Sequence, residues 1–278
     1  MSKARRAAAG SVKHATPKQS ARSARKQRPR ELKLVPISLS CEIKPGDSLA
    51  DKLLQALREE NLVLESGDIL VIKHKIISKA ENRLVDLATV IPSAASVRWA
   101  KTYGLDARVI EVAVRESRGV IRRKNGVLIT ETKQGFICAN SGVDVSNVDG
   151  GGHALLLPVD PDRSAQKLYR AIKERTALSI PILITDSFGR PWREGLVDFC
   201  IGIAGMEPLR DDRERRDPYG YVLRASIEAI ADELACAAGL VCGKLNRTPA
   251  CLVRGFPHVP ARGRARELLR PAASDLFR

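Results

Sequence analysis

The sequence is poor in aromatic residues and histidines and has no long apolar run, and each shortage excludes a class of protein. Only 4% of the 278 residues are aromatic, and four are histidines. No histidine has the Cys/His spacing of a structural zinc site. The apolar runs are far shorter than the roughly 20 residues of a membrane-spanning helix, and the N-terminus lacks the apolar core of a secretory signal. We therefore expect a cytoplasmic protein without membrane contact.

Cysteine pairs with the spacing of a redox or metal motif are also missing. The chain has six cysteines, and none forms a CxxC pair: Cys41, Cys138, Cys200, Cys236, Cys242 and Cys251. Most of their neighbours are apolar, which favours small buried side chains in a reducing compartment over disulfides.

The net charge of +15 belongs to the two ends of the chain. Of the 47 Lys and Arg residues, ten lie in residues 1–30 and five after residue 256, and these two segments hold two of the 32 acidic residues. The body, residues 31–256, therefore has 32 basic and 30 acidic residues. We expect a disordered basic tail over 1–30, a catalytic domain over 31–256 and a basic C-terminal tail over 257–278. The first tail also has the composition of an organellar transit peptide, and nucleic-acid binding through the tails is the alternative.

Hydrophobic periodicity predicts strands and helices without a regular βαβ repeat. The expected strands are 32–37, 69–72, 127–132, 135–139, 180–184, 197–203 and 250–253. The expected helices are 47–60 with Asp47 as cap, 94–103, 106–117, a helix capped by Asp162 through 174, and 224–243. This order favours an α+β fold of two intimate mixed subdomains over a doubly wound sheet.

One segment rich in oxygen ligands follows the expected strand 135–139. Asp144 offers a hard carboxylate for Mg²⁺ or Mn²⁺, and Asn147 can donate to phosphate oxygens. Three glycines at 150–152 would let backbone amides approach an anion. The alternative is an ordinary turn capped by the Asn and Asp side chains.

A second polar segment follows the expected buried strand 180–184, which we expect to end at Thr185 and Asp186. Asp186 and Ser187 offer further metal ligands, and Arg190 and Arg193 offer guanidinium groups for phosphate or carboxylate. An acidic residue at the carboxyl end of a buried strand lies where α/β-type sheets bind ligands. The alternative is a loop with an Asp–Arg ion pair.

Two basic segments complete the candidate site. Lys79, with Lys75 nearby, can neutralise a triphosphate, although a solvated lysine is the ordinary alternative. Gly243 and Lys244 follow the last expected helix. They do not form a P-loop, because only three residues separate Gly239 from Gly243 and Leu245 replaces the required Ser or Thr. They can still bring cations to a phosphate at a helix C-terminus.

Together these segments resemble the family of coenzyme F420-0:L-glutamate ligases. The resemblance spans about residues 32–256, and its specificity comes from several motifs in one order. The motifs are 43–47, 77–81, 138–147, 155–162, 184–193, 201–205, 231–234 and 253–255.

The resemblance implies a dimeric α+β enzyme that uses GTP, Mn²⁺ or Mg²⁺ and often K⁺ to add L-glutamate to F420-0, a deazaflavin precursor ending in a carboxylate. It implies that Asp144, Asp186 and Ser187 are metal ligands. It also implies these nucleotide contacts: Ser38, Leu39, Ser40, Cys41, His74, Lys75, Lys79 and Asn147. Some relatives have an acidic metal ligand where this chain has Lys244, so the sequence leaves open whether a second metal site exists or is filled differently.

The expected mechanism activates the acceptor carboxylate as an acyl phosphate, which the amine of glutamate then attacks. Asp144 and Asp186, through metal, and Arg190 and Arg193 would stabilise the charge that develops during transfer. The sequence leaves open GTP against ATP, the number of glutamates added, and a different carboxylate acceptor for the same mechanism.

Overall fold

The computed structural model describes residues 31–146, 148 and 150–275. Its main sheet has the order β1-β12-β2-β8-β9. The strands are β1 (Lys33–Ile37), β12 (Ala250–Arg254), β2 (Ile69–Lys73), β8 (Ile182–Arg190) and β9 (Arg193–Ala204). Only the β2–β8 pair is parallel within this sheet; the other three neighbouring pairs are antiparallel. Chain segments from both ends of the sequence therefore meet beside β2.

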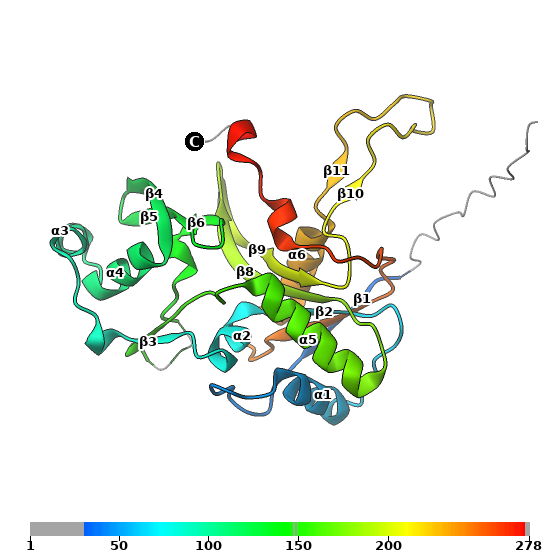
Figure 1. The fold of residues 1–278 in the computed structure, drawn as a ribbon, viewed down its shortest axis with the longest axis horizontal. Coiled ribbons are helices and arrows are strands. Elements are labelled where there is room, and N and C mark those ends of the chain that lie inside the picture. The colour runs from blue at the N-terminus through cyan, green and yellow to red at the C-terminus, as the bar shows by residue number, and fades with distance from the viewer. Residues whose placement is uncertain (1–30, 147, 149, 276–278) are drawn as a thin grey trace, which may run out of the picture.

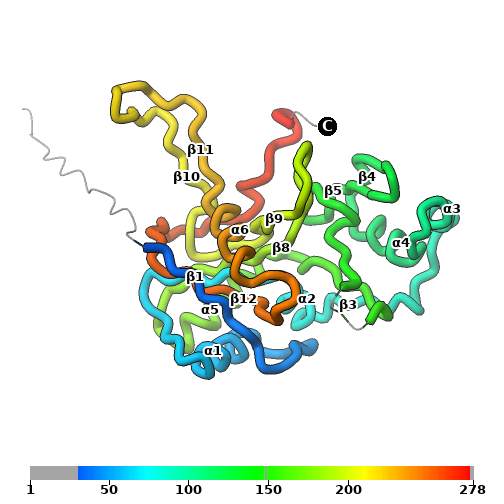
Figure 2. Tube along the Cα trace, turned by 180° about the vertical axis from the view of Figure 1, so that it is seen from behind, coloured from blue at the N-terminus to red at the C-terminus, as the bar shows by residue number. Residues whose placement is uncertain are grey.

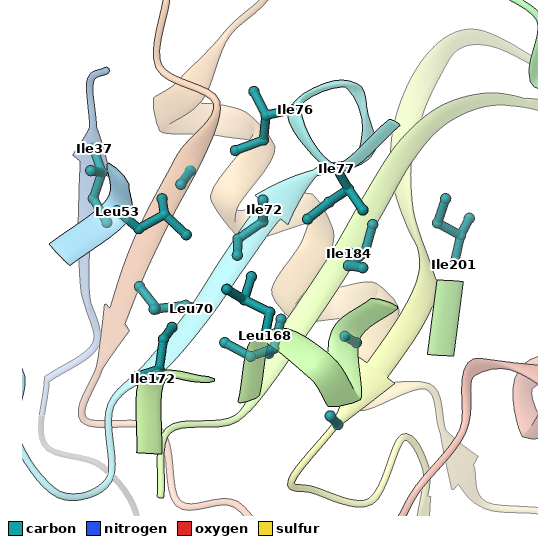
Figure 3. Close-up of a cluster of buried hydrophobic side chains, with 14 of the residues drawn as sticks. Ile37, Leu53, Leu70, Ile72, Ile76, Ile77, Leu168, Ile172, Ile184 and Ile201 are labelled. Carbon is teal, nitrogen blue, oxygen red and sulfur yellow. The ribbon is translucent and has the colours of Figure 1, made fainter. Parts of the chain in front are cut away.

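Helices cover both faces of this sheet (Figures 1 and 2). Helices α1 (Leu49–Glu59) and α5 (Pro161–Thr176) cover one face, and α6 (Ile230–Cys242) covers the other. In β2, Leu70 and Ile72 belong to the first core and Ile69 and Val71 to the second, because alternate side chains of a strand point to opposite faces. Burial on both faces explains why β2 is a continuous apolar run. Figure 3 shows the first core, to which Leu70 and Ile72 contribute.

A smaller unit packs beside the main sheet (Figure 1). It contains β4 (Ser117–Lys124), β5 (Val127–Thr132) and β6 (Ile137–Ala139) with helices α3 (Ala94–Tyr103) and α4 (Ala107–Arg115). The unit has its own apolar core. Strands β3 (Leu84–Asp86) and β7 (His153–Leu155) pair with each other, and the 3₁₀ turns η1 (Leu87–Thr89) and η2 (Asn140–Gly142) complete the unit. The mixed α/β character expected from the sequence is confirmed.

The β10–β11 arm, which we define as residues 208–228, projects from the body in both views (Figures 1 and 2). It contains the short antiparallel pair β10 (Arg210–Asp211) and β11 (Ile227–Glu228). The remaining elements are α2 (His74–Ala80) and the 3₁₀ turns η3 (Ala265–Leu268) and η4 (Ala272–Ser274). None of the helices in the described ranges is long and apolar enough to cross a membrane.

Two helix caps differ by one or two residues from their expected positions. Helix α1 is capped by Ser48, while the Asp47 carboxylate accepts a bond from the backbone N–H of Lys44. Helix α5 is capped by Asp160. Asp162 lies inside its first turn and accepts from the backbone N–H groups of Ile203 and Ala265. The carboxylates of Asp47 and Asp162 thus accept bonds from backbone N–H groups outside the predicted caps. In each segment a second residue that can cap a helix lies one or two positions away and takes the capping role.

Tertiary pairing changed several expected elements. Strand β8 continues to Arg190 instead of ending near Asp186, because β9 pairs with it along its whole length. Helix α6 begins at Ile230 and not at residue 224, because Ile227–Glu228 pairs with β10. Helix α2 and strand β4 were not predicted: seven residues are too few to show helical periodicity, and β4 is mostly exposed.

The C-terminal segment does not behave as the expected solvated tail. Part of it packs on the body: Ala265 is fully buried and donates its backbone N–H to Asp162, and Leu268 and Leu269 pack against the two cores. A Cβ at Gly263 would lie 2.3 Å from the carbonyl oxygen of Met206, so the backbone passes very close there. The packing was not predicted because the segment is rich in arginine, which is typical of a solvated tail. The predicted tail over 1–30 lies outside the described residues.

Candidate active site

Three consecutive residues where β2 ends and α2 begins each pair with a carboxylate from a different segment. The pairs are Lys73 Nζ with Asp198 Oδ2 at 3.2 Å, His74 Nε2 with Asp186 Oδ1 at 3.3 Å, and Lys75 Nζ with Asp144 Oδ2 at 2.6 Å. A strand-to-helix turn makes this possible, because successive side chains there point in different directions. The result is a compact cluster of alternating charge at the carboxyl end of β2.

The sheet topology places two of these carboxylates at an open strand edge. The last β2–β8 pair is Lys73 with Thr185, whereas β8 continues to Arg190. Strand β2 therefore stops pairing with β8 after Thr185, and Asp186 is the first residue of β8 beyond that point. Strand β9 runs antiparallel to β8 and places Asp198 opposite Ser187. These side chains thus lie at the carboxyl end of the parallel β2–β8 pair, which is where open α/β sheets bind ligands.

Asp144 comes from the smaller unit and reaches the same place. Its backbone pairs with Leu155, and its Oδ1 accepts the backbone N–H of Ser146 at 2.7 Å. Burial pushes the pKa of Asp144 upward, but the Lys75 ammonium and the Ser146 donors outweigh it, so its pKa lies below the ordinary value. Asp144 is therefore a carboxylate at neutral pH.

Two cavities meet at this cluster. The smaller, about 200 Å³, is lined by Lys73, His74, Lys75, Asp144, Ser146, Thr185, Asp186, Ser187, Leu196, Asp198, Gly243 and Lys244. The larger, about 520 Å³, is lined by Leu39, Ser40, Cys41, Glu42, Ile43, Lys73, Lys75, Ile76, Lys79, Val148, Gly150, Gly243, Lys244, Leu245, Arg247, Thr248 and Pro249. Lys73, Lys75, Gly243 and Lys244 line both. The two cavities therefore share a wall of basic side chains and loop backbone.

The two cavities differ in the charges that line them. Among the described residues around the larger cavity, the positively charged side chains are Lys73, Lys75, Lys79, Lys244 and Arg247, and Glu42 is the acidic one. Glu42 forms an ion pair with Lys79. The smaller cavity holds three carboxylates, on Asp144, Asp186 and Asp198, and the same number of lysines, which it shares with the larger one. The excess of positive charge favours a polyanion in the first cavity, and the carboxylates of the second offer oxygen ligands to a cation.

Most of the residues predicted from the sequence gather at these cavities. Leu39, Ser40 and Cys41 line the larger one, whereas Ser38 lies outside both linings and its backbone N–H donates to Glu60. The two predicted arginines do not reach either lining. Arg190 and Arg193 flank the β8–β9 turn, where Arg190 donates to the backbone oxygen of Glu194 at 3.0 Å. Asn147 lies outside the described residues.

Several lining residues were not among the predicted site residues, and three of them are charged side chains that bear on the site. Asp198 falls in an expected strand, where a lone acidic residue among apolar neighbours was the available signal. Lys73 is the polar end of β2 and lines both cavities. Arg247 follows the Gly243–Lys244 turn, which the incomplete P-loop pattern had already marked as basic.

The donors of the smaller cavity match a hard divalent cation held partly by substrate. Asp144 and Asp186 supply carboxylate oxygens and Ser187 a hydroxyl. His74 is 1% exposed, and its Nε2 has no hydrogen-bond partner although Asp186 is near. Within the described ranges, no three His, Cys, Asp or Glu side chains converge at metal-binding distances. Mg²⁺ sites that use one or two carboxylates and complete their shell with substrate phosphates have this composition.

Comparison with known proteins agrees with this arrangement. The family model described as F420-0:Gamma-glutamyl ligase matches residues 39–255, a span that contains both cavity linings. The chain belongs to this family. It is 42% identical to the coenzyme F420:L-glutamate ligase of Methanothermobacter thermautotrophicus over 236 residues, 84% of this chain and 93% of that protein.

A second relative has the same name. The coenzyme F420:L-glutamate ligase of Methanopyrus kandleri is 40% identical over 252 residues, 89% of this chain and 98% of that protein. The matches cover more than four fifths of this chain and nearly the whole length of both relatives. The resemblance seen in the separate sequence motifs is thereby confirmed.

Proposed function

We propose that this protein joins L-glutamate to the carboxylate of coenzyme F420-0 through an amide bond, using GTP and Mg²⁺ or Mn²⁺. The observation that carries the proposal is the shared wall of the two cavities, where Lys73, Lys75 and Lys244 lie between a basic space and one that holds three carboxylates. Such a wall suits a triphosphate in the larger cavity with its terminal phosphate directed at the carboxylates of the smaller one. The relatives named coenzyme F420:L-glutamate ligase and the family description F420-0:Gamma-glutamyl ligase support the choice of acceptor and of glutamate.

The chemistry requires a leaving group on the acceptor, because a carboxylate and an amine do not condense at neutral pH. An acceptor oxygen attacks the γ-phosphorus, the bond between the β-γ bridging oxygen and that phosphorus breaks, and GDP leaves. The deprotonated amine of glutamate then attacks the acyl carbon, and inorganic phosphate departs. No side chain has to become covalently attached, so the residues act by binding and by electrostatics.

The basic side chains have defined tasks in the first step. Lys79 and Arg247 line only the larger cavity and would bind the phosphates that remain on the leaving nucleotide. Lys75 is within reach of Asp144 and lines both cavities, so it would hold charge beside the transferred group. Partial burial strengthens these interactions because water screens them less than at an open surface.

Asp144 and Asp186 would hold the divalent ion, with Ser187 as a further oxygen ligand. When bound, such an ion screens the approaching anions and polarises the transferred phosphoryl group. Lys244 lies in the lining of both cavities and adds a positive charge there. A second divalent ion beside Lys244 would be repelled, so we propose a single site.

A homodimer is the assembly we propose, and the projecting arm supports it. Tyr219 and Tyr221 on the β10–β11 arm are 95% and 63% exposed. Tyrosines are enriched at protein interfaces. Light scattering of the full chain and of a variant lacking residues 213–222 tests this: a monomeric full chain would contradict it.

The test of the proposed function uses purified protein with F420-0, L-glutamate, GTP and MnCl₂. Mass spectrometry should show the acceptor gaining glutamyl units, with GDP formed in step. Reactions with ATP in place of GTP, or without MnCl₂, measure the nucleotide and metal requirements. GDP formation with another carboxylic acid but not with F420-0 would favour the ligase of the same mechanism with a different acceptor.

A further inference from the structure

Asp198 is an acidic residue inside a buried strand, and its carboxylate is held from two sides. It lies in β9 next to Phe199 and Cys200 and is 8% exposed. Oδ1 accepts the hydroxyl of Ser187, directly across the β8–β9 pair. Oδ2 accepts from Lys73 Nζ at 3.2 Å. A buried carboxylate with both oxygens occupied is costly to place and is retained where it organises other groups.

Helix α6 leaves a space that this carboxylate fills. A Cβ at Gly239 would lie 2.5 Å from Asp198 Oδ2 and 3.1 Å from its Cγ, so only glycine admits the carboxylate there. Cys236, one turn earlier in α6, donates its thiol to the backbone oxygen of Asp198 at 3.2 Å. Glycine in a helix interior is less stable than alanine. Helix α6 is therefore less stable than it would be with alanine at the position where Gly239 leaves room for the carboxylate.

Both partners of Asp198 belong to the cavities. Ser187 lines the smaller cavity, and Lys73 lines both. Because the Ser187 hydroxyl donates its proton to Asp198, its lone pairs remain available to a ligand in the cavity. Lys73 has three ammonium protons, so the bond to Asp198 leaves two for phosphate oxygens. One buried carboxylate thus sets the direction of two cavity groups.

We infer that Asp198 is a positioning residue for the metal–nucleotide complex: it orients the Ser187 hydroxyl and the Lys73 ammonium at the junction of the two cavities. The inference rests on the function proposed above. Asp198 does not need to touch the substrate, since each of its oxygens already accepts a bond from the protein. Partners that orient a metal ligand typically change metal affinity or activity by 10–100-fold when they are replaced.

The first test is Asp198→Asn, which keeps the shape but removes the charge and one acceptor. Titration calorimetry measures GTP binding in the presence of MnCl₂, and steady-state kinetics separates KM for GTP from KM for glutamate. We expect the dissociation constant of GTP with MnCl₂ and its KM to rise about 10–100-fold, with the KM for glutamate within about threefold of wild type. Unchanged GTP affinity in a folded Asp198→Asn protein would overturn the inference.

Gly239→Ala tests the same carboxylate without removing its charge. The added methyl displaces Asp198 from its place, so GTP affinity should fall in this variant as well, although alanine is the better helix former. If Gly239→Ala binds GTP with MnCl₂ as wild type does, the position of the carboxylate is unimportant and the inference fails.

Asp68→Asn is the matched control. Asp68 is 1% exposed and accepts two bonds from Arg254, yet it lines neither cavity. We expect it to lower the melting temperature while leaving GTP affinity unchanged. A loss of GTP affinity in Asp68→Asn equal to that in Asp198→Asn would show a general loss of structure and overturn the inference.

The outcomes separate this inference from the proposed function. A wild-type protein that binds no GTP with MnCl₂ contradicts both. A wild-type protein that binds it, with Asp186→Ala defective and Asp198→Asn unaffected, retains the proposed function and rejects the role of Asp198.

Discussion

Replacement of Asp186 by alanine is the sharpest test of the proposed cation site. The Asp186 side chain lines the smaller cavity and is 16% exposed, and its structural contacts are few. Oδ1 accepts the neighbouring backbone N–H of Ser187 at 2.8 Å and lies 3.3 Å from His74 Nε2. Loss of one such hydrogen bond costs about 1 kcal/mol of stability. The variant should therefore remain folded.

The expected loss of activity is much larger than the loss of stability. Two unit charges about 4 Å apart interact by about 4 kcal/mol at an effective dielectric constant of 20. That energy, if it is realised in the transition state, corresponds to about a thousandfold in rate. Asp186→Ala should reduce kcat/KM by roughly this factor and remove the response to MnCl₂.

The assay is GDP release coupled to mass spectrometry of the glutamylated product, at several concentrations of MnCl₂. Circular dichroism and thermal melting establish that the variant is folded. Asp51→Ala is the control, because Asp51 pairs with Arg175 on the exposed face of α1 and lines neither cavity. A folded Asp186→Ala protein with turnover within tenfold of wild type and an ordinary MnCl₂ response would refute the assignment.

Three further predictions concern the tail, the core and acid stability. Deleting residues 1–30 should leave ligase activity unchanged, and a soluble truncation without activity would place the tail in the site. Leu53→Ala, at a fully buried position of the main core, should lower the free energy of unfolding in urea by about 2–5 kcal/mol. Glu111 accepts from the backbone and hydroxyl of Ser93, from Ser96 and from Arg115, which lowers its pKa to about 2. Its contribution to stability is present above its ordinary pKa of 4.5 and is lost as the pH falls toward 2. Glu111→Gln should therefore destabilise the protein at pH 7 and less so at pH 3, and an equal difference at both pH values would contradict this account.

The parts of the fold that the sequence predicted well are those with a strong local pattern. Helix α3 and strand β5 have the expected bounds because caps and turns mark both of their ends. Strand β2 was recognised from its continuous apolar run. The failures occur where pairing with a distant segment decides the structure, as in the second half of β8 and the residues before α6.

The candidate site was predicted in its residue types more than in its geometry. Asp144, Asp186 and Lys75 were each conspicuous as polar residues after apolar runs, and the structure brings them to one cavity. Arg190 and Arg193 were equally conspicuous but lie at the turn of the β8–β9 hairpin. A local pattern shows that a residue is polar and follows a strand, but it does not show how far that strand continues.

The sequence by itself determined the family, the mixed α/β class and most of the charged residues of the site, because these depend on residue identity and order along the chain. Tertiary structure alone decided that Lys73, His74 and Lys75 face three carboxylates, since those carboxylates come from segments 69 to 125 residues away. It also decided the surroundings of Asp198, because Ser187 lies on the neighbouring strand and Gly239 lies in helix α6, which follows later in the chain. Such contacts depend on which strands are neighbours in the sheet, and periodicity within a segment carries no information about its neighbours.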